Sequence, residues 1–108
     1  PRSLLESLRH ALQPHIHLPD LDAQQAAELC GHDKRALARK LKSRGTTLMQ
    51  EITRLREETA IRALLETDSS IADIATSVGY SDPSVFSRAF RKWTGVSPRE
   101  YRKGHTVQ

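Results

Sequence analysis

Apolar residues recur along this chain at the three- and four-residue spacing of an α-helix. The clearest case is residues 83–94, where Phe86, Ala89, Phe90 and Trp93 share one helical face. No stretch alternates apolar and polar residues for long enough to indicate a β-strand. The pattern predicts an all-α fold with seven helices, near residues 3–13, 22–30, 33–44, 47–66, 71–78, 83–94 and 98–103.

Residues that begin and end helices mark most of these boundaries. In a capping box, a Ser, Thr or Asp side chain bonds the backbone three residues later, and a Glu or Gln there bonds back. This spacing occurs in Ser3 with Glu6, Asp22 with Gln25, Thr47 with Gln50, Ser97 with Glu100 and, with a shorter side chain, Ser70 with Asp73. Proline follows the capping residue at Asp82-Pro83 and Ser97-Pro98. Helix ends are expected at Gly31, Gly45, Gly79, Gly95 and Gly104, and a short linker between Pro14 and Pro19.

The helices form an internal repeat. Ala27 and Gly31 recur 48 residues later as Ala75 and Gly79. Leu37, Arg39 and Leu41 recur 49 residues later as Phe86, Arg88 and Phe90. Each copy is a short helix with a small residue at mid-length, a turn ending the helix at glycine, and a basic amphipathic helix. This arrangement is typical of a helix-turn-helix, here present twice.

A long helix over 47–66 is expected to join the two copies. An apolar stripe along this helix predicts that it packs against both copies. The stripe consists of Leu48, Ile52, Leu55, Ala60, Ala63 and Leu64. At 1.5 Å per residue the helix is about 30 Å long, close to the roughly 34 Å between successive major grooves on one side of DNA. We therefore divide one compact domain into residues 1–46 with the first unit, the connecting helix 47–66, and residues 67–108 with the second unit.

Composition narrows the class of protein. At 108 residues, with 37% apolar and 28% charged residues, the chain is ordinary globular material. No apolar run approaches the roughly 18 residues of a membrane span, so no membrane association is expected. A single cysteine, Cys30, forms no internal disulfide and indicates a reducing, cytoplasmic setting.

The net charge of +4 is unevenly distributed. Residues 34–44 carry +6 and residues 88–103 carry +5, whereas the remaining residues carry −7. Such segregation is typical of a face that binds a polyanion. Two solvated helix faces with no ligand are the alternative interpretation.

The two basic helices present polar residues opposite their apolar stripes. Arg39 and Arg88 hold the same place in the repeat, and an arginine can donate two hydrogen bonds to guanine O6 and N7. Surface ion pairs are the alternative for these arginines. The spacing of Trp93 and the phenylalanines favours the core over base stacking.

The sequence contains no pattern typical of a catalytic site, a metal site or a cofactor site. Cys30 precedes a helix-ending glycine and is expected in the core. His10, His15 and His17 lack the Cys or carboxylate spacing that completes a metal site. No catalytic triad, phosphate loop or pair of carboxylates stands out. We therefore expect no enzyme activity, no metal and no cofactor.

Residues 70–101, SIADIATSVGYSDPSVFSRAFRKWTGVSPREY, resemble the second helix-turn-helix and closing segment of AraC/XylS-type transcription regulators. The resemblance extends less specifically to about residue 20, through Cys30-Gly31 and the Arg-Leu-Arg segment at 54–56. It implies two helix-turn-helix units in successive major grooves of an asymmetric DNA site. It also implies a separate effector-binding or dimerisation domain, usually preceding this one.

By the resemblance, the positions that read bases in the family correspond to Arg35, Ala38 and Arg39 in the first unit and to Ser84, Val85 and Arg88 in the second. Ala38 departs from the larger polar residues often found there, and contact with a thymine methyl replaces a hydrogen bond as the expectation. Phosphate contacts are expected from Lys34, Lys42, Ser87, Arg91 and Lys92.

The predicted function is sequence-specific binding of double-stranded DNA by a bacterial transcription regulator. The alternative is a protein-interaction module that docks RNA polymerase or another regulator. The chain opens at Pro1 without a methionine. Removal of the initiator methionine or excision of a fragment would explain this start, and because of the resemblance we expect a fragment whose effector-binding and dimerisation domain lies outside it.

Overall fold

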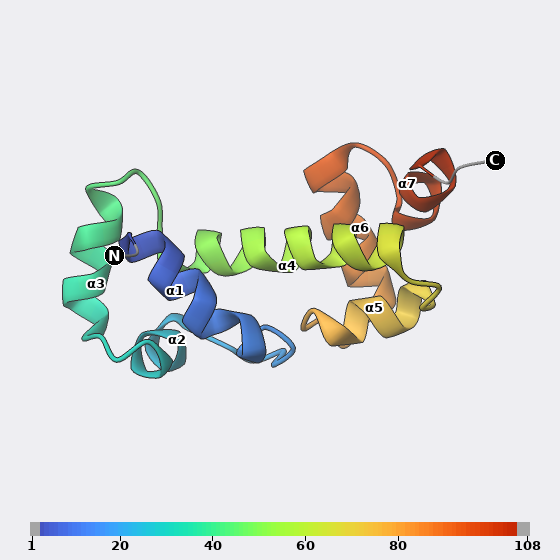
Figure 1. Ribbon diagram of the computed structural model, residues 1–108. Coiled ribbons are helices and arrows are strands. Elements are labelled where there is room, and N and C mark those ends of the chain that lie inside the picture. The colour runs from blue at the N-terminus through green and yellow to red at the C-terminus, as the bar shows by residue number, and fades with distance from the viewer. Residues whose placement is uncertain (1–2, 106–108) are drawn as a thin grey trace. The chain divides into compact units, whose positions relative to one another are not determined.

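A computed structural model describes residues 3–105 of the chain, and every regular element in that range is helical (Figure 1). The seven predicted α-helices are confirmed, with ends within two residues of those expected. An additional 3-10 turn, η1, overlaps the start of the predicted linker, and its three residues are too few for a periodic signal. The elements are α1 (Leu4–Leu12), η1 (Gln13–His15), α2 (Ala23–Leu29), α3 (Lys34–Lys42), α4 (Leu48–Glu66), α5 (Ile71–Ser77), α6 (Pro83–Thr94) and α7 (Pro98–His105).

The chain forms two compact units whose boundary falls inside α4, between Leu55 and Arg56. Each unit has its own hydrophobic core. The first contains Leu8, Leu12, Ile16, Leu21, Ala26, Ala27, Leu37, Leu41, Leu48, Ile52 and Leu55. The second contains Ala60, Leu64, Ile74, Ala75, Val78, Phe86 and Phe90. The predicted stripe of α4 is therefore confirmed, with its early residues in the first core and its later ones in the second.

The aromatic stripe of α6 lies in the second core, as predicted. Phe86 and Phe90 are fully buried, and the ring of Trp93 lies 6.1 Å from that of Phe90. Tyr101 on α7 also contacts Phe90, with the ring centroids 5.4 Å apart in an edge-to-face arrangement. Edge-to-face pairs add about 0.5–1.5 kcal/mol beyond burial, so this cluster anchors α6 and α7 to one another.

Capping residues set the helix starts as expected. Asp22, Thr47 and Ser97 each exchange both hydrogen bonds of the capping box with the residue three positions later. Ser3 and Ser70 each accept the forward bond from the backbone three residues later.

The expected helix end at Gly104 is wrong. Helix α7 runs through this residue to His105, and Gly104 is not among the described glycines with positive φ. A helical glycine costs only about 1 kcal/mol relative to alanine. The packing of Tyr101 and the capping box at Ser97 hold the helix in spite of that cost.

Candidate nucleic-acid interface

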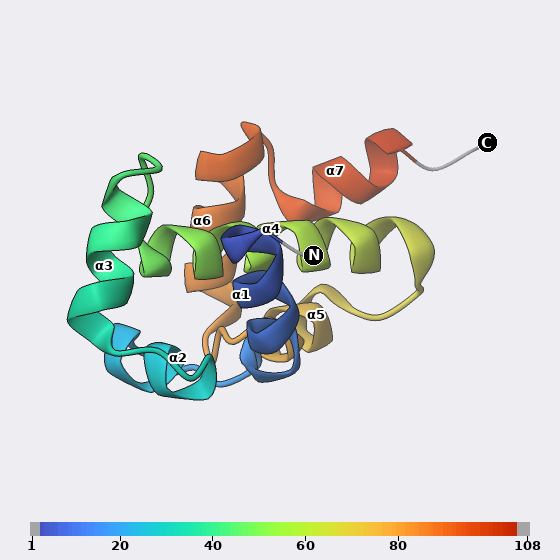
Figure 2. The same ribbon diagram turned by 60° about the vertical axis from the view of Figure 1, so that its left-hand side comes forward.

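The first unit contains a helix-turn-helix formed by α2 and α3 (Figure 2). The turn closes at Gly31, whose φ of 72° is a left-handed conformation that glycine adopts without strain. His32 N–H donates to Ala27 O at 2.9 Å, and Gly31 N–H donates to Glu28 O at 3.0 Å. These two hydrogen bonds end α2 and direct the chain toward α3.

The second unit repeats this turn between α5 and α6. Gly79 has a φ of 93°, Tyr80 N–H donates to Ala75 O at 2.9 Å, and Gly79 N–H donates to Thr76 O at 3.1 Å. Ala75 is fully buried, as Ala27 is in the first unit. The predicted repeat is therefore confirmed, and its two turns have the same pattern of backbone hydrogen bonds.

Both basic helices begin at an aspartate in the same place of the repeat. Asp33 Oδ2 accepts from the backbone N–H of Ala36 at 3.0 Å, and Asp82 Oδ1 accepts from that of Ser84 at 2.8 Å. A cap of this kind stabilises a helix by about 1 kcal/mol. It fixes the first turn of α3 and of α6, where several of the predicted DNA-contacting residues stand.

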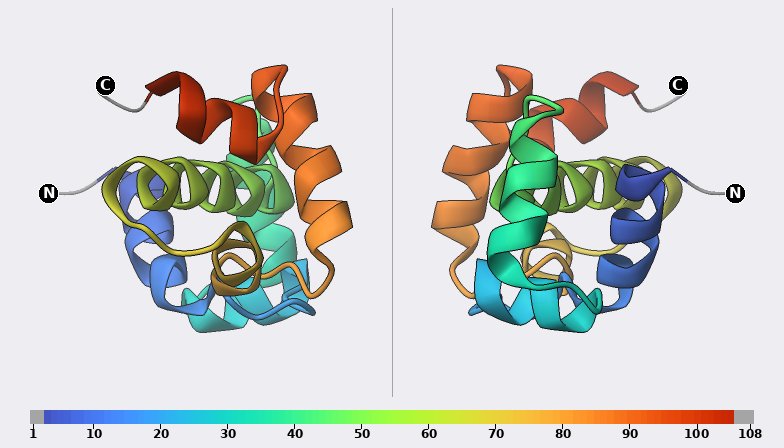
Figure 3. Two further views of the ribbon diagram at one scale, coloured as in Figure 1. Left: turned by 90° about the vertical axis from the view of Figure 1, so that its right-hand side faces the viewer. Right: turned by 90° about the vertical axis from the view of Figure 1, so that its left-hand side faces the viewer.

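The outward residues of α3 form one basic surface of the first unit. Leu37 and Leu41 point into the core. The predicted base-reading and phosphate residues of this helix are all exposed: Lys34, Arg35, Ala38, Arg39 and Lys42. Figure 3 shows α3 along the outside of its unit, with α2 at its N-terminal end.

Helix α6 has the same division into a buried and an outward face. Ser84, Val85, Arg88, Arg91 and Lys92 are exposed, whereas Ser87 is half-buried. Val85 is 40% exposed, which leaves its methyl groups available for contact.

Arg91 makes a surface ion pair with Glu100 at 3.7 Å, and both side chains are about 60% exposed. The hydrogen bond from the Ser97 backbone, followed by the Ser97 side chain, lowers the pKa of Glu100, and Arg91 contributes less. Because an ion pair between exposed side chains is weak, this pair leaves Arg91 able to move to a phosphate.

Arg102 belongs to the basic segment 88–103 but has a structural contact that the sequence did not indicate. Its guanidinium donates to the backbone carbonyls of Leu64 at 3.0 Å, Thr67 at 3.1 Å and Ser69 at 2.8 Å. These carbonyls lie at the end of α4 and in the following loop. Arg102 therefore ties α7 to the segment that leads into α5.

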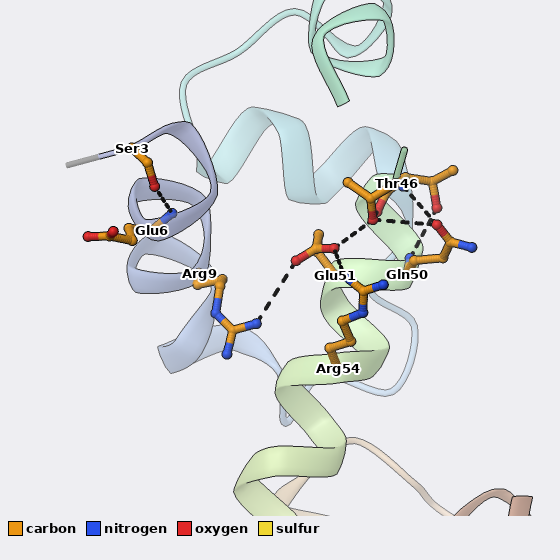
Figure 4. Close-up of polar contacts among 8 residues, drawn as sticks. Ser3, Glu6, Arg9, Thr46, Gln50, Glu51 and Arg54 are labelled. Atoms are coloured by element: carbon orange, nitrogen blue, oxygen red, sulfur yellow. Dashed lines mark hydrogen bonds and ion pairs between the residues drawn. The ribbon is translucent and has the colours of Figure 1, made fainter. Parts of the chain in front are cut away.

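A buried carboxylate holds the turn that follows α3 (Figure 4). The side chain of Glu51 is 2% exposed, and it accepts from the Thr46 hydroxyl at 2.6 Å and from Arg54 at 2.7 Å. Arg9 on α1 lies 3.9 Å away. The network compensates the buried charge and connects α1, α4 and the turn after α3.

The Arg-Leu-Arg segment of α4 is accounted for by packing. Arg54 pairs with Glu51 in the first unit, and Leu55 is in the first core. The guanidinium carbon of Arg56 lies 5.9 Å from the centre of the Tyr80 ring, a cation–π contact within the second unit.

Cys30 was expected in the core but is only half-buried and packs against the first core, and burial raises the pKa of its thiol. The described residues contain no cluster of three or more His, Cys, Asp or Glu residues arranged to hold a metal. No helix within residues 3–105 is both long and apolar enough to cross a membrane.

A family model described as a helix-turn-helix domain matches residues 26–104. The chain is 42% identical over 82 residues to the ornithine utilization regulator of Pseudomonas aeruginosa; the match covers 76% of this chain and 24% of that regulator. The chain thus spans about a quarter of that relative's length.

Two solved structures share the fold over nearly the whole chain. One is a transcriptional regulator with an AraC-type DNA-binding domain from Chromobacterium violaceum, with 27% identity, a TM-score of 0.82 and coverage of 94% of this chain and 91% of that one. The other is the DNA-binding domain of the global transcriptional factor AdpA in complex with a target DNA, with 25% identity, a TM-score of 0.80 and coverage of 96% and 94%. The chain belongs to the AraC/XylS family of helix-turn-helix transcription regulators, as a DNA-binding domain of that family.

Proposed function

We propose that this domain binds a specific, asymmetric site on double-stranded DNA through α3 and α6, and that the regulator containing it acts in the bacterial cytoplasm. The observation that carries the proposal is that Arg39 and Arg88 occupy equivalent positions in the two repeats. Both are exposed arginines at the same position of two helices that share the same turn and the same aspartate cap.

In this proposal, residues in the first two turns of α3 and of α6 contact the bases. Arg39 and Arg88 donate to guanine, Arg35 and Ser84 make polar contacts with base edges, and Ala38 and Val85 contact thymine methyl groups. The phosphate contacts come from Lys34, Lys42, Ser87, Arg91 and Lys92. They position the domain without reading sequence.

The regulator as a whole extends beyond this domain in our proposal. The ornithine utilization regulator is about four times as long as the matched segment, since the match covers 24% of its length. We place effector binding and dimerisation outside residues 1–108. Contact with RNA polymerase would be a separate role, and DNA binding through α3 and α6 does not depend on it.

Salt dependence tests DNA binding against the interaction-module alternative. After a binding site is selected from a random DNA pool, affinity is measured over a range of salt concentrations. Displacement of counterions should give a slope of log affinity against log salt that corresponds to roughly five to ten neutralised phosphates.

Matched variants sharpen this test. Lys92→Ala should reduce the slope by about one, because one phosphate contact is lost. Arg62→Ala removes an exposed charge from α4 that we assign to no contact, and it should leave the slope unchanged. A slope near zero for the unmodified domain would favour the interaction module instead.

A further inference from the structure

A cavity of about 400 Å³ lies in the first unit, lined by residues of α3, of the following turn and of the start of α4, with one residue of α2. Pockets that hold small organic molecules have volumes of roughly 300–1,000 Å³. The cavity is therefore large enough for a small ligand. None of the contacts proposed above with DNA bases or phosphates requires its interior.

The walls of the cavity are apolar. Their apolar side chains are Ala23, Leu37, Ala38, Leu48 and Met49. Leu37 and Leu48 belong to the first core, whereas Met49 is 40% exposed. Hydrocarbon is favoured over water against such walls. Methionine also adapts its shape to different ligands.

The rest of the lining consists of Thr46, Thr47 and two cations, Lys34 and Lys42. The lysines stand four residues before and four residues after Ala38, so all three lie on one face of α3. Both lysines are exposed, and within residues 3–105 neither ammonium group forms an ion pair with a carboxylate. An anion held at these lysines can have its apolar part inside the cavity.

We infer that this cavity binds a small amphipathic organic anion, with its hydrocarbon part against Ala38 and Met49 and its carboxylate at Lys34 and Lys42. An inorganic anion makes no use of the apolar walls, and a neutral hydrocarbon makes no use of the lysines. Charge and wall chemistry together therefore select a molecule that has both parts.

Binding there has a consequence for DNA that depends on the proposed function. Lys34 and Lys42 are proposed phosphate contacts, and Ala38 is a proposed base contact on the same face. A carboxylate at the lysines competes with phosphate for the same charges. The ligand and DNA should therefore exclude one another at α3.

The direct test uses the 108-residue chain without DNA. Octanoate is titrated at concentrations below those at which it forms micelles, and backbone NMR shifts are followed. Saturable shifts are expected at Ala38, Thr47 and Met49. Octanol, which has the same chain but no charge, should bind about threefold more weakly, since an ion pair between partly exposed groups adds only modestly to affinity.

Two variants at Met49 separate charge from shape, and Met49 is not among the proposed DNA contacts. Met49→Glu places a carboxylate beside the cavity and should weaken octanoate binding about threefold or more relative to Met49→Gln, which has the same length without charge. Circular dichroism confirms that both variants fold. Should Met49→Glu fail to fold, Lys42→Gln provides the second measure, with an equal expected loss.

Octanoate should also weaken DNA binding by the unmodified domain and by Met49→Gln, and less so by Met49→Glu. Shifts that do not saturate, that spread over the second unit, or that octanol reproduces at equal affinity would overturn the cavity assignment even if DNA binding is intact. Saturable binding at the cavity with unchanged DNA affinity would overturn the competition. A domain that binds no DNA would instead refute the proposed function, and the direct titration would still decide the cavity.

Discussion

Arg39 and Arg88 are exposed side chains on helices whose buried faces are filled by leucine and phenylalanine. An arginine that donates two hydrogen bonds to guanine distinguishes one base pair from the others. A lysine on phosphate adds affinity for any sequence. The two kinds of contact therefore respond differently to single substitutions.

We expect Arg39→Ala and Arg88→Ala each to cost about 1–3 kcal/mol on the selected site and to relax preference at one base position. Lys92→Ala should weaken binding to selected and random DNA alike. Affinities on a set of single-base variants of the site provide the measurement. An equal loss on selected and random DNA would show that the arginines contact phosphate instead.

Arg102 differs from the other basic residues of its segment because its guanidinium is occupied by three backbone carbonyls. Each hydrogen bond to a charged group contributes about 1.5–3 kcal/mol, and solvent at a half-exposed site reduces the sum of the three. Arg102→Ala should therefore lower the free energy of unfolding by about 1–3 kcal/mol. Arg102→Lys should recover little, since an ammonium group lacks the planar fork of donors.

Urea denaturation measures this loss, and Arg99→Ala on the same helix provides the control. Arg99 is exposed, and surface substitutions of this kind usually change stability by less than about 0.5 kcal/mol. Equal stability of the Arg102→Ala and Arg99→Ala variants would contradict a structural role for Arg102.

At the scale of elements, two glycines with opposite conformations make a matched pair. Gly31 ends α2 at a φ of 72°, whereas Gly104 lies inside α7. A Cβ atom at either position would meet nothing within 4 Å, so backbone conformation alone decides the effect of alanine.

Gly31→Ala should destabilise the domain by about 1–2 kcal/mol, because alanine is strained in the left-handed region. Gly104→Ala should stabilise it by up to about 1 kcal/mol, since alanine favours the helix. Thermal unfolding monitored by circular dichroism would show the opposite signs. A loss of stability in both variants would mean that Gly104 ends α7 in solution.

At the scale of the whole molecule, the two units present different residues on equivalent helices. Arg35, Ala38 and Arg39 face outward from α3, and Ser84, Val85 and Arg88 face outward from α6. One chain should therefore bind an asymmetric site. Hydroxyl-radical footprinting should show two protected segments centred about 10 base pairs apart. A single protected segment, on a site long enough for two, would exclude one unit from DNA reading.

The connecting helix can be tested separately from the two units. Leu55→Pro removes a backbone hydrogen bond within α4 and costs about 3 kcal/mol or more. It should abolish high-affinity binding even where much of each unit survives. Leu55→Met has a similar volume and leaves the helix unbroken, so it should retain binding. Equal affinities of the two variants would show that an intact connecting helix is not needed.

The sequence by itself determined the features that depend on neighbouring residues. Helical periodicity, capping pairs and turn glycines act within about four residues, so all seven α-helices and the aromatic stripe of α6 were predictable. The repeat was visible because both turns need a small residue and a glycine at the same spacing. The exposed positions of α3 and α6 followed from the same periodicity, although their DNA contacts remain predictions.

Only the tertiary structure decided the contacts between residues far apart in the chain. Arg102 looked like one more exposed cation, but it bonds carbonyls 33 to 38 residues away. No pattern in the sequence set Glu51 apart, but its side chain is buried and lies 3.9 Å from Arg9, which precedes it by 42 residues. The cavity beside Lys34 and Lys42 arises where three helices meet. Such features depend on how helices pack, and residue spacing along one helix carries no information about the neighbour that it will meet.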